Sequence, residues 1–415
     1  MPGPLILRLV GPRALNTFGR AVIYSTVLWE LYQRTHDKLV VAAVGSVLVI
    51  PVVLLFVASG SLVDRGDRRA LATAAAFSTG MVGVGLAIAS YYDAPVWVFL
   101  ALLFAQGCIT SVHAPASSSL IPMILPRDEL QRANRIGSSL QELAAIGGPS
   151  LGGLALSVMD PHWIYAWVGA TGLASAALYR SLPAPRTAAP GPAPEMEGAS
   201  GRSRPGNDRR DWRVGLRFIF NSPLLLPALT LDMFAVLFAG VTALMPVIAT
   251  DVLDVGPFAY GVLRSAQSAG AVTMAVIGGR LPAWKRPGRV LLVVVALFGV
   301  VTIAFGLSTS LPLSVALLFL AGALDNISVV IRLTLEQIVV PDQIRGRVSA
   351  VHYVFIGMSN ELGAAESGVA AWAIGTIPAI VAGGAVAIAV VGVVAVKWRG
   401  LAAMPPLSEL GPESH

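Results

Sequence analysis

Six of the charged side chains that lie within long apolar segments in the second half of the chain are candidates for a functional site. They are Asp232, Arg264, Asp325, Arg332, Glu361 and Glu366. A charged side chain in hydrocarbon is costly, so such residues usually face one another or a water-filled cavity and mark a functional site. Carboxylates hold and release protons, whereas an arginine stays charged and exchanges carboxylate partners. The pattern therefore indicates movement of protons or charge inside an apolar bundle.

The spacing of these residues predicts which of them meet. Asp325 and Arg332 are seven residues apart and Glu336 follows Arg332 by four, so the three share one helical face. Depths counted at about 1.5 Å per residue from the segment ends match in three pairs. Those pairs are Asp232 with Arg332, Arg264 with Glu366, and Asp325 with Glu361.

The third pair consists of two carboxylates. Two acids that share a dry site cannot both be ionised, so one of them is expected to hold a proton. We therefore expect Asp325 and Glu361 to form a proton-coupling site, and the other two pairs to be ion pairs that form and break. The alternative is a static charge network that only holds the second half together.

The composition of the chain is that of a membrane protein. It has 415 residues, of which 55% are hydrophobic and only 13% charged, and its mean hydropathy is +0.73. A helix crosses a hydrocarbon layer of about 30 Å with roughly 20 apolar residues. Long enough runs lie near residues 15–32, 39–62, 70–91, 96–121, 136–157, 163–179, 223–250, 260–281, 290–308, 313–338, 349–372 and 378–396. The sequence thus predicts an all-α membrane protein with twelve transmembrane helices.

These helices are expected to form two pseudo-symmetric six-helix halves, at residues 1–180 and 222–398, a recurrent arrangement in transporters. Between them, residues 181–210 are rich in Pro, Gly and Arg, which predicts a disordered cytoplasmic linker. Residues 211–221 place apolar and arginine side chains at helical spacing, which predicts an amphipathic helix in the membrane interface. The alternative is a simple extension of the seventh span. Residues 399–415 form a cytoplasmic tail.

The distribution of Lys and Arg predicts the orientation of the chain. Clusters at residues 65–69, 127–135, 285–289 and 345–347 fall in alternate loops, whereas the opposite loops carry only Arg34 and Lys38. Because positive loops stay in the cytoplasm, both termini are expected there. No cleaved signal peptide is recognised at the start. The single cysteine, Cys108, excludes an intramolecular disulfide and a cysteine metal site.

The first half offers softer candidates for an interior cavity. They are Arg20, Glu30, Gln106, His113 and Glu142. Gln106 and His113 lie seven residues apart and share a helical face. We interpret His113 as a satisfied polar core residue rather than a proton carrier, because the sequence gives it no definite partner.

Two further motifs point to moving parts. Residues 60–69 join two spans through a tight turn. A cytoplasmic gate is expected from Gly60, Asp64, Arg65, Arg68 and Arg69. The alternative is a charge cluster that only sets the topology. The fifth span contains Gly148, Pro149, Gly152 and Gly153, which permit a bend and close approach of another helix. Tight packing without motion is the alternative.

On these residues the chain resembles the major facilitator superfamily along all twelve spans. Residues 60–69 are similar to its signature G-x-L-x-D-R-x-G-R-[KR], with Asp67 in the second glycine slot. Residues 144–153 are similar to its antiporter motif G-x-x-x-G-P-x-x-G-G, with Ala144 in the leading slot, and this implies export against an ion gradient. The helix-four motif keeps Gln106 and Gly107 but has Leu103 in place of the usual arginine, so we assign coupling to the second half.

Finer features resemble a bacterial branch that includes enterobactin exporters and macrolide efflux proteins. These features are Leu28 to Tyr32, Asp64 to Arg69, and Ser359 to Gly363 with Glu366. We therefore expect a secondary active exporter of a small hydrophobic molecule, siderophore or drug, working by alternating access with proton antiport. It is expected to be a multi-pass monomer in the bacterial inner membrane.

Two other functions are weighed against export. An importer or uniporter of a small metabolite is the runner-up, and a non-transporting membrane receptor is the candidate from another class. The sequence has no G-x-S-x-G, no phosphate-binding loop and no paired histidine ligands, so we expect no enzyme, no cofactor and no metal site. Loop arginines explain the pI of about 9.8, and no nucleic-acid partner is expected.

Overall fold

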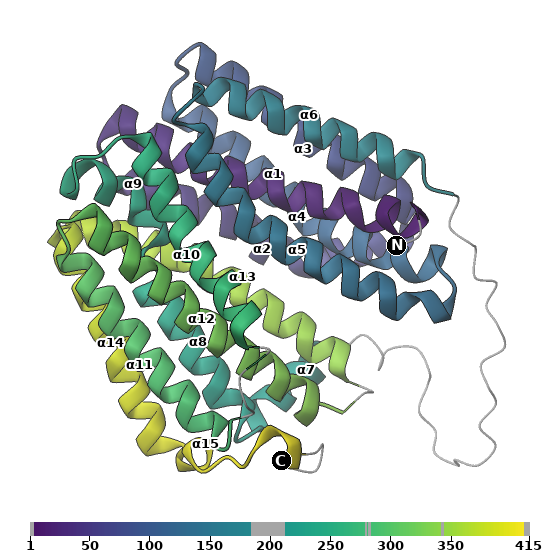
Figure 1. Cartoon of the computed structure of the whole chain (residues 1–415). Coiled ribbons are helices and arrows are strands. Elements are labelled where there is room, and N and C mark those ends of the chain that lie inside the picture. The colour runs from purple at the N-terminus through teal and green to yellow at the C-terminus, as the bar shows by residue number, and fades with distance from the viewer. Residues whose placement is uncertain (1–3, 184–211, 279, 281–283, 342–343, 411–415) are drawn as a thin grey trace, which may run out of the picture.

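The computed structural model describes residues 4–183, 212–278, 280, 284–341 and 344–410. The described chain is helical, and two six-helix bundles account for most of it (Figure 1). The first bundle contains α1 (Pro4–Thr35), α2 (Lys38–Arg65), α3 (Arg68–Tyr91), α4 (Val96–Ile124), α5 (Arg127–Ala155) and α6 (Pro161–Arg180). The second contains α8 (Leu225–Ala239), α10 (Pro257–Gly278), α11 (Pro287–Leu307), α12 (Leu311–Val339), α13 (Arg345–Ile374) and α14 (Thr376–Lys397). The predicted fold class is confirmed.

Short elements complete the second bundle. Helix α8 stops at Gly240, and the chain continues through η2 (Val241–Leu244), α9 (Met245–Val247) and the π-helical η3 (Ile248–Val252). Interrupted spans of this kind are typical of transporters, and the break was not predicted. Helix α7 (Trp212–Asn221) precedes α8, while α15 (Arg399–Ala402) and η4 (Leu407–Glu409) follow α14.

Six described helical segments are both long and apolar enough to cross a membrane by composition alone. They are Arg68–Tyr91, Val96–Ile124, Leu225–Val252, Pro287–Leu307, Leu311–Val339 and Thr376–Lys397. Helices α1, α5 and α13 are longer than several of these but carry more charged residues, and all three line the cavity described below. A cavity-lining helix hides its polar face from lipid, which explains why composition does not single it out.

The two bundles meet at one end and diverge at the other (Figure 1). We call the diverging end, which holds the N terminus, α7 and α15, the terminal end, and we call the opposite end, near α9, the far end. At the far end one buried core contains residues of both bundles, such as Val27 and Leu31 with Leu244 and Met245. Toward the terminal end each bundle has its own core, around Leu120 in the first and Leu335 in the second. The bundles are therefore joined at the far end and separate toward the terminal end.

Glycines bring the bundles into close contact where they join. A Cβ atom on Gly45 of α2 would lie 2.8 Å from the Cβ of Ala364 on α13. A Cβ on Gly153 of α5 would lie 2.8 Å from the Cα of Gly261 on α10. Such distances exclude a side chain without backbone movement, so two glycine-lined helix pairs hold the bundles together.

Some predicted boundaries need correction or lie outside the described residues. Helix α1 begins at Pro4 rather than near residue 15, because its early residues Ile6, Leu9 and Val10 are buried in the first bundle. The amphipathic segment is a helix, and Gly215 packs against the backbone of Arg347 on α13. Most of the predicted linker at residues 181–210 lies outside the described chain, which omits residues 184–211, and Leu182 at its start is buried in the core of the first bundle.

Candidate functional site

A cavity of about 350 Å³ lies between the bundles at the middle of the helices. Its walls come from α1, α2, α4 and α5 of the first bundle and α13 of the second. Arg20, Tyr24, Gln106 and Thr110 are polar groups on one side, and Glu361 lies on the other. We call this space the central cavity. Most of the remaining lining is apolar, which suits a ligand with a large hydrophobic surface and a few polar groups.

Arg20 and Glu361 are the charged residues among those that line the central cavity. They interact electrostatically, although no hydrogen bond joins them in the described chain. The Glu361 Oε2 atom is buried and has no hydrogen-bond partner. Because an unpartnered buried carboxylate oxygen is costly, this position favours a bound ligand, a proton or a change of partner. Arg20 and Glu361 thus face each other across the two bundles. Depths along the spans were compared only within the second half, so this pair was not predicted from the sequence.

A second cavity, of about 210 Å³, adjoins the first and is called the side cavity here. It is lined by Thr242, Arg264, Gln267, Ser268 and Asp325, together with Ala145 and Pro149 of α5. Ala145 and Pro149 line the central cavity as well, so α5 forms the partition between the two spaces. The Arg264 Nη1 atom donates to the Thr242 carbonyl at 3.2 Å, while the Arg264 Nε atom is buried without a partner.

Of the three predicted pairings of charged residues, one is formed and two are not. Asp232 and Arg332 form an ion pair in which both side chains are buried. Arg264 and Glu366 form no ion pair in the described structure, because Arg264 binds Thr242 and Glu366 accepts a hydrogen bond from the Ser367 hydroxyl at 3.4 Å. Asp325 and Glu361 line different cavities and share no hydrogen bond. Equal depth along a bundle does not fix which face of a helix points inward, and this explains the two pairs that are not formed.

Glu30 belongs to a polar network at the far end rather than to the described cavities. Its carboxylate accepts hydrogen bonds from Arg34 at 2.5 Å, Ser90 at 2.6 Å and Tyr165 at 2.6 Å. These bonds join α1 to α3 and α6 within the first bundle. Arg34 also binds Asp93 at 3.1 Å. A fully satisfied carboxylate of this kind stabilises the bundle, and Glu30 lines neither the central nor the side cavity.

The remaining first-half candidates differ in position. Gln106 lines the central cavity, and its Nε2 atom donates to Thr79 at 3.4 Å. His113 contacts the ring of Tyr179, but its Nε2 atom is buried without a partner, so the interpretation of a satisfied core residue does not hold. Glu142 is exposed and lines none of the cavities described here. Its predicted place in a cavity therefore has no support from the central or the side cavity.

The loop between α2 and α3 is only partly described, since the side chains of Gly60, Asp64 and Arg65 lie outside the described residues. Asp67, which departs from the signature, caps α3 by accepting hydrogen bonds from the amides of Arg69 and Ala70. The Arg69 side chain binds the carbonyl of Arg180 at the end of α6. Arg68 approaches the Met123 sulfur at 3.3 Å. These contacts lie within the first bundle, as expected when the terminal ends are apart.

The antiporter-like motif of α5 provides contacts in two directions. Cβ atoms on Gly148 and Gly152 would lie 2.7 Å from Ala21 and 2.5 Å from Ser25, both on α1. Gly153 instead faces Gly261 of the second bundle. Ser150 and Ser268, on α5 and α10, share a hydrogen bond of 3.1 Å. The motif therefore places α5 against its own bundle and the opposite one at once.

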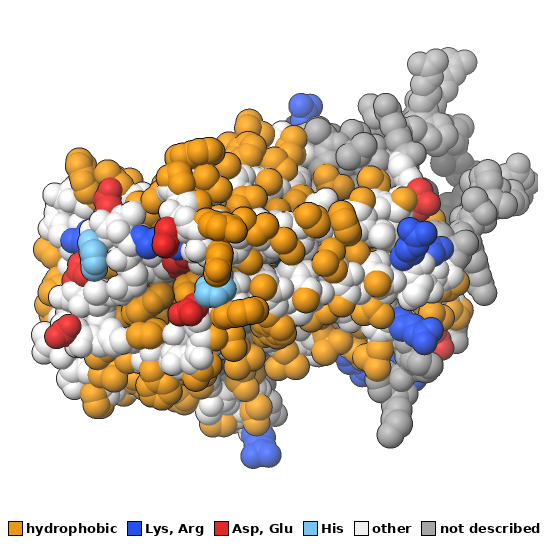
Figure 2. Space-filling model, turned by 90° about the horizontal axis from the view of Figure 1, so that it is seen from above, with side chains coloured by type: hydrophobic (Ala, Val, Ile, Leu, Met, Phe, Trp, Pro, Cys, Tyr) orange, Lys and Arg blue, Asp and Glu red, His pale blue; other side chains and the backbone are white. Residues whose placement is uncertain are grey.

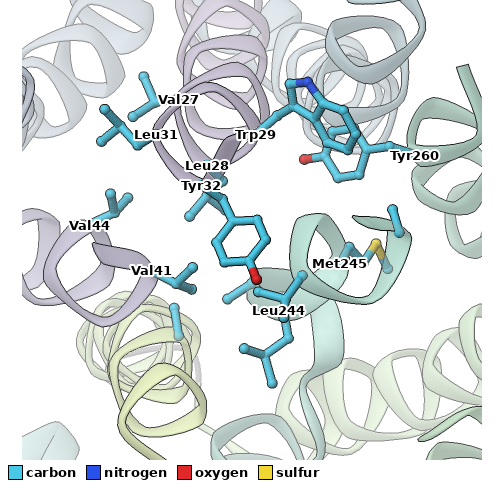
Figure 3. Close-up of a cluster of buried hydrophobic side chains, with 14 of the residues drawn as sticks. Val27, Leu28, Trp29, Leu31, Tyr32, Val41, Val44, Leu244, Met245 and Tyr260 are labelled. Carbon is cyan, nitrogen blue, oxygen red and sulfur yellow. The ribbon is translucent and has the colours of Figure 1, made fainter. Parts of the chain in front are cut away.

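Hydrogen bonds between α1 and η3 close the far end, and sequence reasoning missed them. The Tyr32 hydroxyl donates to Asp251 at 2.5 Å, and the Gln33 amide donates to Thr250 at 2.7 Å. Beside them, Trp29 stacks on Tyr260 with ring centroids 4.8 Å apart (Figure 3). We call the bonds of Tyr32 and Gln33 the far-end latch. A π-helix is rare and often marks a functional site, but its position at Asp251 has no sequence signature that we recognise.

Replacing Tyr32 with Phe is expected to loosen the far-end latch. The substitution removes one hydrogen bond, worth about 1 kcal/mol, so the open far end should be favoured roughly fivefold. The measurement is the rate at which maleimide modifies a cysteine placed at Ala243 in the shared core, in a Cys108→Ser background. Tyr91→Phe, at an exposed tyrosine near the same end, is the matched control and should leave that rate unchanged. Equal rates in both variants would show that the latch does not hold the far end closed.

Two six-helix bundles with a charged cavity at mid-depth between them define a multi-pass membrane transporter. Residues 13–364 match the family model described as Major Facilitator Superfamily, and the chain belongs to that family. Its members are secondary transporters rather than enzymes.

Two groups of relatives are similar in sequence. Macrolide efflux protein A of Streptococcus pyogenes is 26% identical over 155 residues, which cover 37% of this chain and 38% of the relative. The match thus spans about two fifths of that protein. The enterobactin exporter EntS of Citrobacter koseri is 26% identical over 344 residues, which cover 82% of this chain and 78% of the relative.

Solved structures show the same fold. A bacterial homologue of the human lysosomal transporter Spinster, in an inward-facing and occupied conformation, has a TM-score of 0.70 at 16% identity and covers 98% of this chain and 97% of its own. A bacterial homologue of the iron transporter ferroportin, in an inward-facing state, has a TM-score of 0.66 at 15% identity and covers 97% of this chain and 100% of its own.

Proposed function

We propose that the protein is a proton-coupled antiporter that exports a small hydrophobic molecule, siderophore or drug across a bacterial inner membrane. The observation that carries the proposal is the central cavity, whose apolar walls contain one charged residue from each bundle, Arg20 and Glu361. A proton on Glu361 weakens its attraction to Arg20, and loss of that proton restores it. Proton binding thus changes the free energy of contact between the bundles, which alternating access requires.

Export is supported by the antiporter-like motif on α5 and by the sequence similarity to exporters. Pro149 lies in the partition between the central and side cavities. Movement of α5 against α10 therefore changes both spaces together. The macrolide and enterobactin relatives carry molecules of very different chemistry, so the substrate class is proposed only as hydrophobic with a few polar groups.

Surface charge supports an orientation with the terminal end in the cytoplasm. Figure 2 shows a broad hydrophobic band, Lys and Arg gathered toward the end on its right, and Asp and Glu most frequent toward the left. Exposed acids at the far end include Asp37, Asp93, Asp160, Asp251 and Asp254. Positively charged segments stay in the cytoplasm, so both termini are cytoplasmic and the described conformation is open inward.

Transport into inside-out membrane vesicles tests the proposal. The full chain is expected to accumulate radiolabelled erythromycin or enterobactin when the vesicle interior is acidified, and nigericin should abolish the accumulation by collapsing the pH gradient. An importer would accumulate the probe only in right-side-out vesicles. A uniporter would equilibrate it without a gradient, and a receptor would bind it without transport. Accumulation that survives nigericin would contradict proton antiport.

A further inference from the structure

A group of ionisable side chains in the second bundle lies outside the central and side cavities. His352 on α13 and Glu336 on α12 form a buried pair through Nδ1 and Oε2, with 3% and 5% of each residue exposed. The Ser349 hydroxyl donates to the other carboxylate oxygen of Glu336 at 2.5 Å. Both oxygens of Glu336 are thereby engaged, which fixes the carboxylate against the imidazole.

This arrangement determines which ring nitrogen of His352 is available. A carboxylate only accepts hydrogen bonds when it is ionised, so the nitrogen that faces Glu336 carries the hydrogen. In the neutral ring the other nitrogen, Nε2, is then a bare acceptor. The Nε2 atom is buried and has no partner in the described structure.

His352 borders a third cavity, of about 110 Å³, which Asp232 also lines. Apart from these two residues the described lining has no ionisable side chain, and α7 contributes only Ile219 and Phe220. Thr230 and Ser359 are further polar residues in a lining that is otherwise apolar, and together with Asp232 and His352 they supply the partners that an ordered water needs. Asp232 and His352 each lie seven residues from the terminal-end start of their helices, which is about 10 Å of helix length.

We propose that Ser349, Glu336 and His352 form a proton-relay site that connects Asp232 with the water at the terminal end. The proposal rests on the proton-coupled function proposed above. A proton leaves the Asp232 carboxyl group, passes through cavity water and binds His352 Nε2, while Glu336 stabilises the imidazolium. Nε2 is buried in the described structure, so it releases the proton when local opening lets water from the terminal end reach the ring.

Release of this proton leaves Asp232 as a carboxylate, and its ion pair with Arg332 forms. That pair is present in the described conformation, in which the terminal ends are apart. When Asp232 is protonated, Arg332 loses this partner. Glu336 is closer along α12 but is already bound to Ser349 and His352, so Asp325, seven residues away on the same face, becomes the alternative acid. The relay therefore controls which acid Arg332 neutralises, and Asp325 lines the side cavity.

His352→Gln tests the relay in reconstituted vesicles of the full chain, with erythromycin as the probe. Accumulation driven by a pH gradient should fall at least about fivefold, because proton release becomes slow. Exchange of labelled for unlabelled erythromycin without a gradient should change less than about twofold, because it needs no net proton movement. His162→Gln, which alters a histidine at the far-end start of α6 that lines none of the three cavities, is the control and should leave both rates unchanged. An equal loss of both rates in His352→Gln would indicate a structural role and overturn the relay.

A second measurement separates failure of the relay from failure of the proposed function. Deuterium exchange at the imidazole C2 carbon, followed by mass spectrometry, reports both titration and water access of each histidine without any transport. The wild-type His352 ring should exchange with solvent deuterium, because the relay requires water to reach it. A ring that does not exchange would overturn the relay even if the protein is a proton antiporter. Exchange of the His352 ring in a protein without gradient-driven transport would instead contradict the proposed function alone.

Discussion

Glu361→Gln is expected to reduce transport driven by a pH gradient by roughly tenfold or more. Glutamine keeps the shape of the side chain but neither binds a proton nor attracts Arg20, so the contact between the bundles no longer depends on proton binding. A change of only about 1.4 kcal/mol in that dependence is a factor of ten in an equilibrium. The measurement is erythromycin accumulation in inside-out vesicles with and without the gradient.

The control for this prediction is Glu142→Gln, which removes a glutamate that is exposed and lines none of the described cavities. It should retain wild-type accumulation. Gradient-free exchange of erythromycin should survive in Glu361→Gln, since the cavity keeps its shape. Full gradient-driven accumulation by the Glu361→Gln protein would exclude this residue as a coupling group.

Gly153→Ala is expected to weaken the junction of the bundles at the far end. The added Cβ would meet the Cα of Gly261 at 2.8 Å, and backbone atoms have to move to relieve the contact. Overpacking of this kind costs about 1–3 kcal/mol, which favours separation of the bundles by roughly 5- to 150-fold. The rate of maleimide reaction at a cysteine replacing Ala243 should rise accordingly, and transport should fall.

A matched control lies on the same helix. A Cβ on Gly147 meets no atom within 4 Å, so Gly147→Ala should leave the reaction rate and transport unchanged. Alanine also favours a helix over glycine by about 1 kcal/mol, so reduced helix stability cannot explain a loss in either variant. Equal behaviour of Gly153→Ala and Gly147→Ala would show that close approach of α5 and α10 is unimportant.

Most of the fold could be predicted from the sequence because lipid leaves few alternatives. Long apolar runs in lipid must be helices. Twelve such runs fit the length of the chain, and this number indicated an architecture of two six-helix bundles. The break at Gly240 was not predicted, because the apolar run continues through it without a charge and Pro246 follows only six residues later. The early start of α1 was missed for a related reason, since Pro12 and two arginines obscure a segment whose apolar side chains are buried.

The candidate site could be predicted only in part. The cost of a charge in lipid identified Arg20, Arg264, Asp325 and Glu361 as residues of an interior, and the structure places them around two adjoining cavities. Their partners could not be predicted, because pairing depends on helix rotation and on contacts between bundles. Asp232 and Arg332 are matched both in depth and in facing direction, and they do pair.

Residues with ordinary surroundings in the sequence were missed altogether. His352 follows a charged loop and precedes an apolar run, and nothing local indicates its contact with Glu336, sixteen residues earlier. Tyr32 and Asp251 are 219 residues apart, so only the tertiary structure brings them together. Gly153 and Gly261 are also far apart in the sequence and meet only in the fold, although the motif around Gly153 did indicate close helix packing.

Distances between the bundles at both ends test alternating access most directly. Spin labels at Gln131 and Lys285 report the terminal end, and labels at Asp93 and Asp254 report the far end, in a Cys108→Ser background. Changing the pH or adding erythromycin should shorten the first distance while lengthening the second, and Glu361→Gln should suppress the pH response. Two distances that stay fixed, or that lengthen together, would contradict proton-driven alternating access to the central cavity.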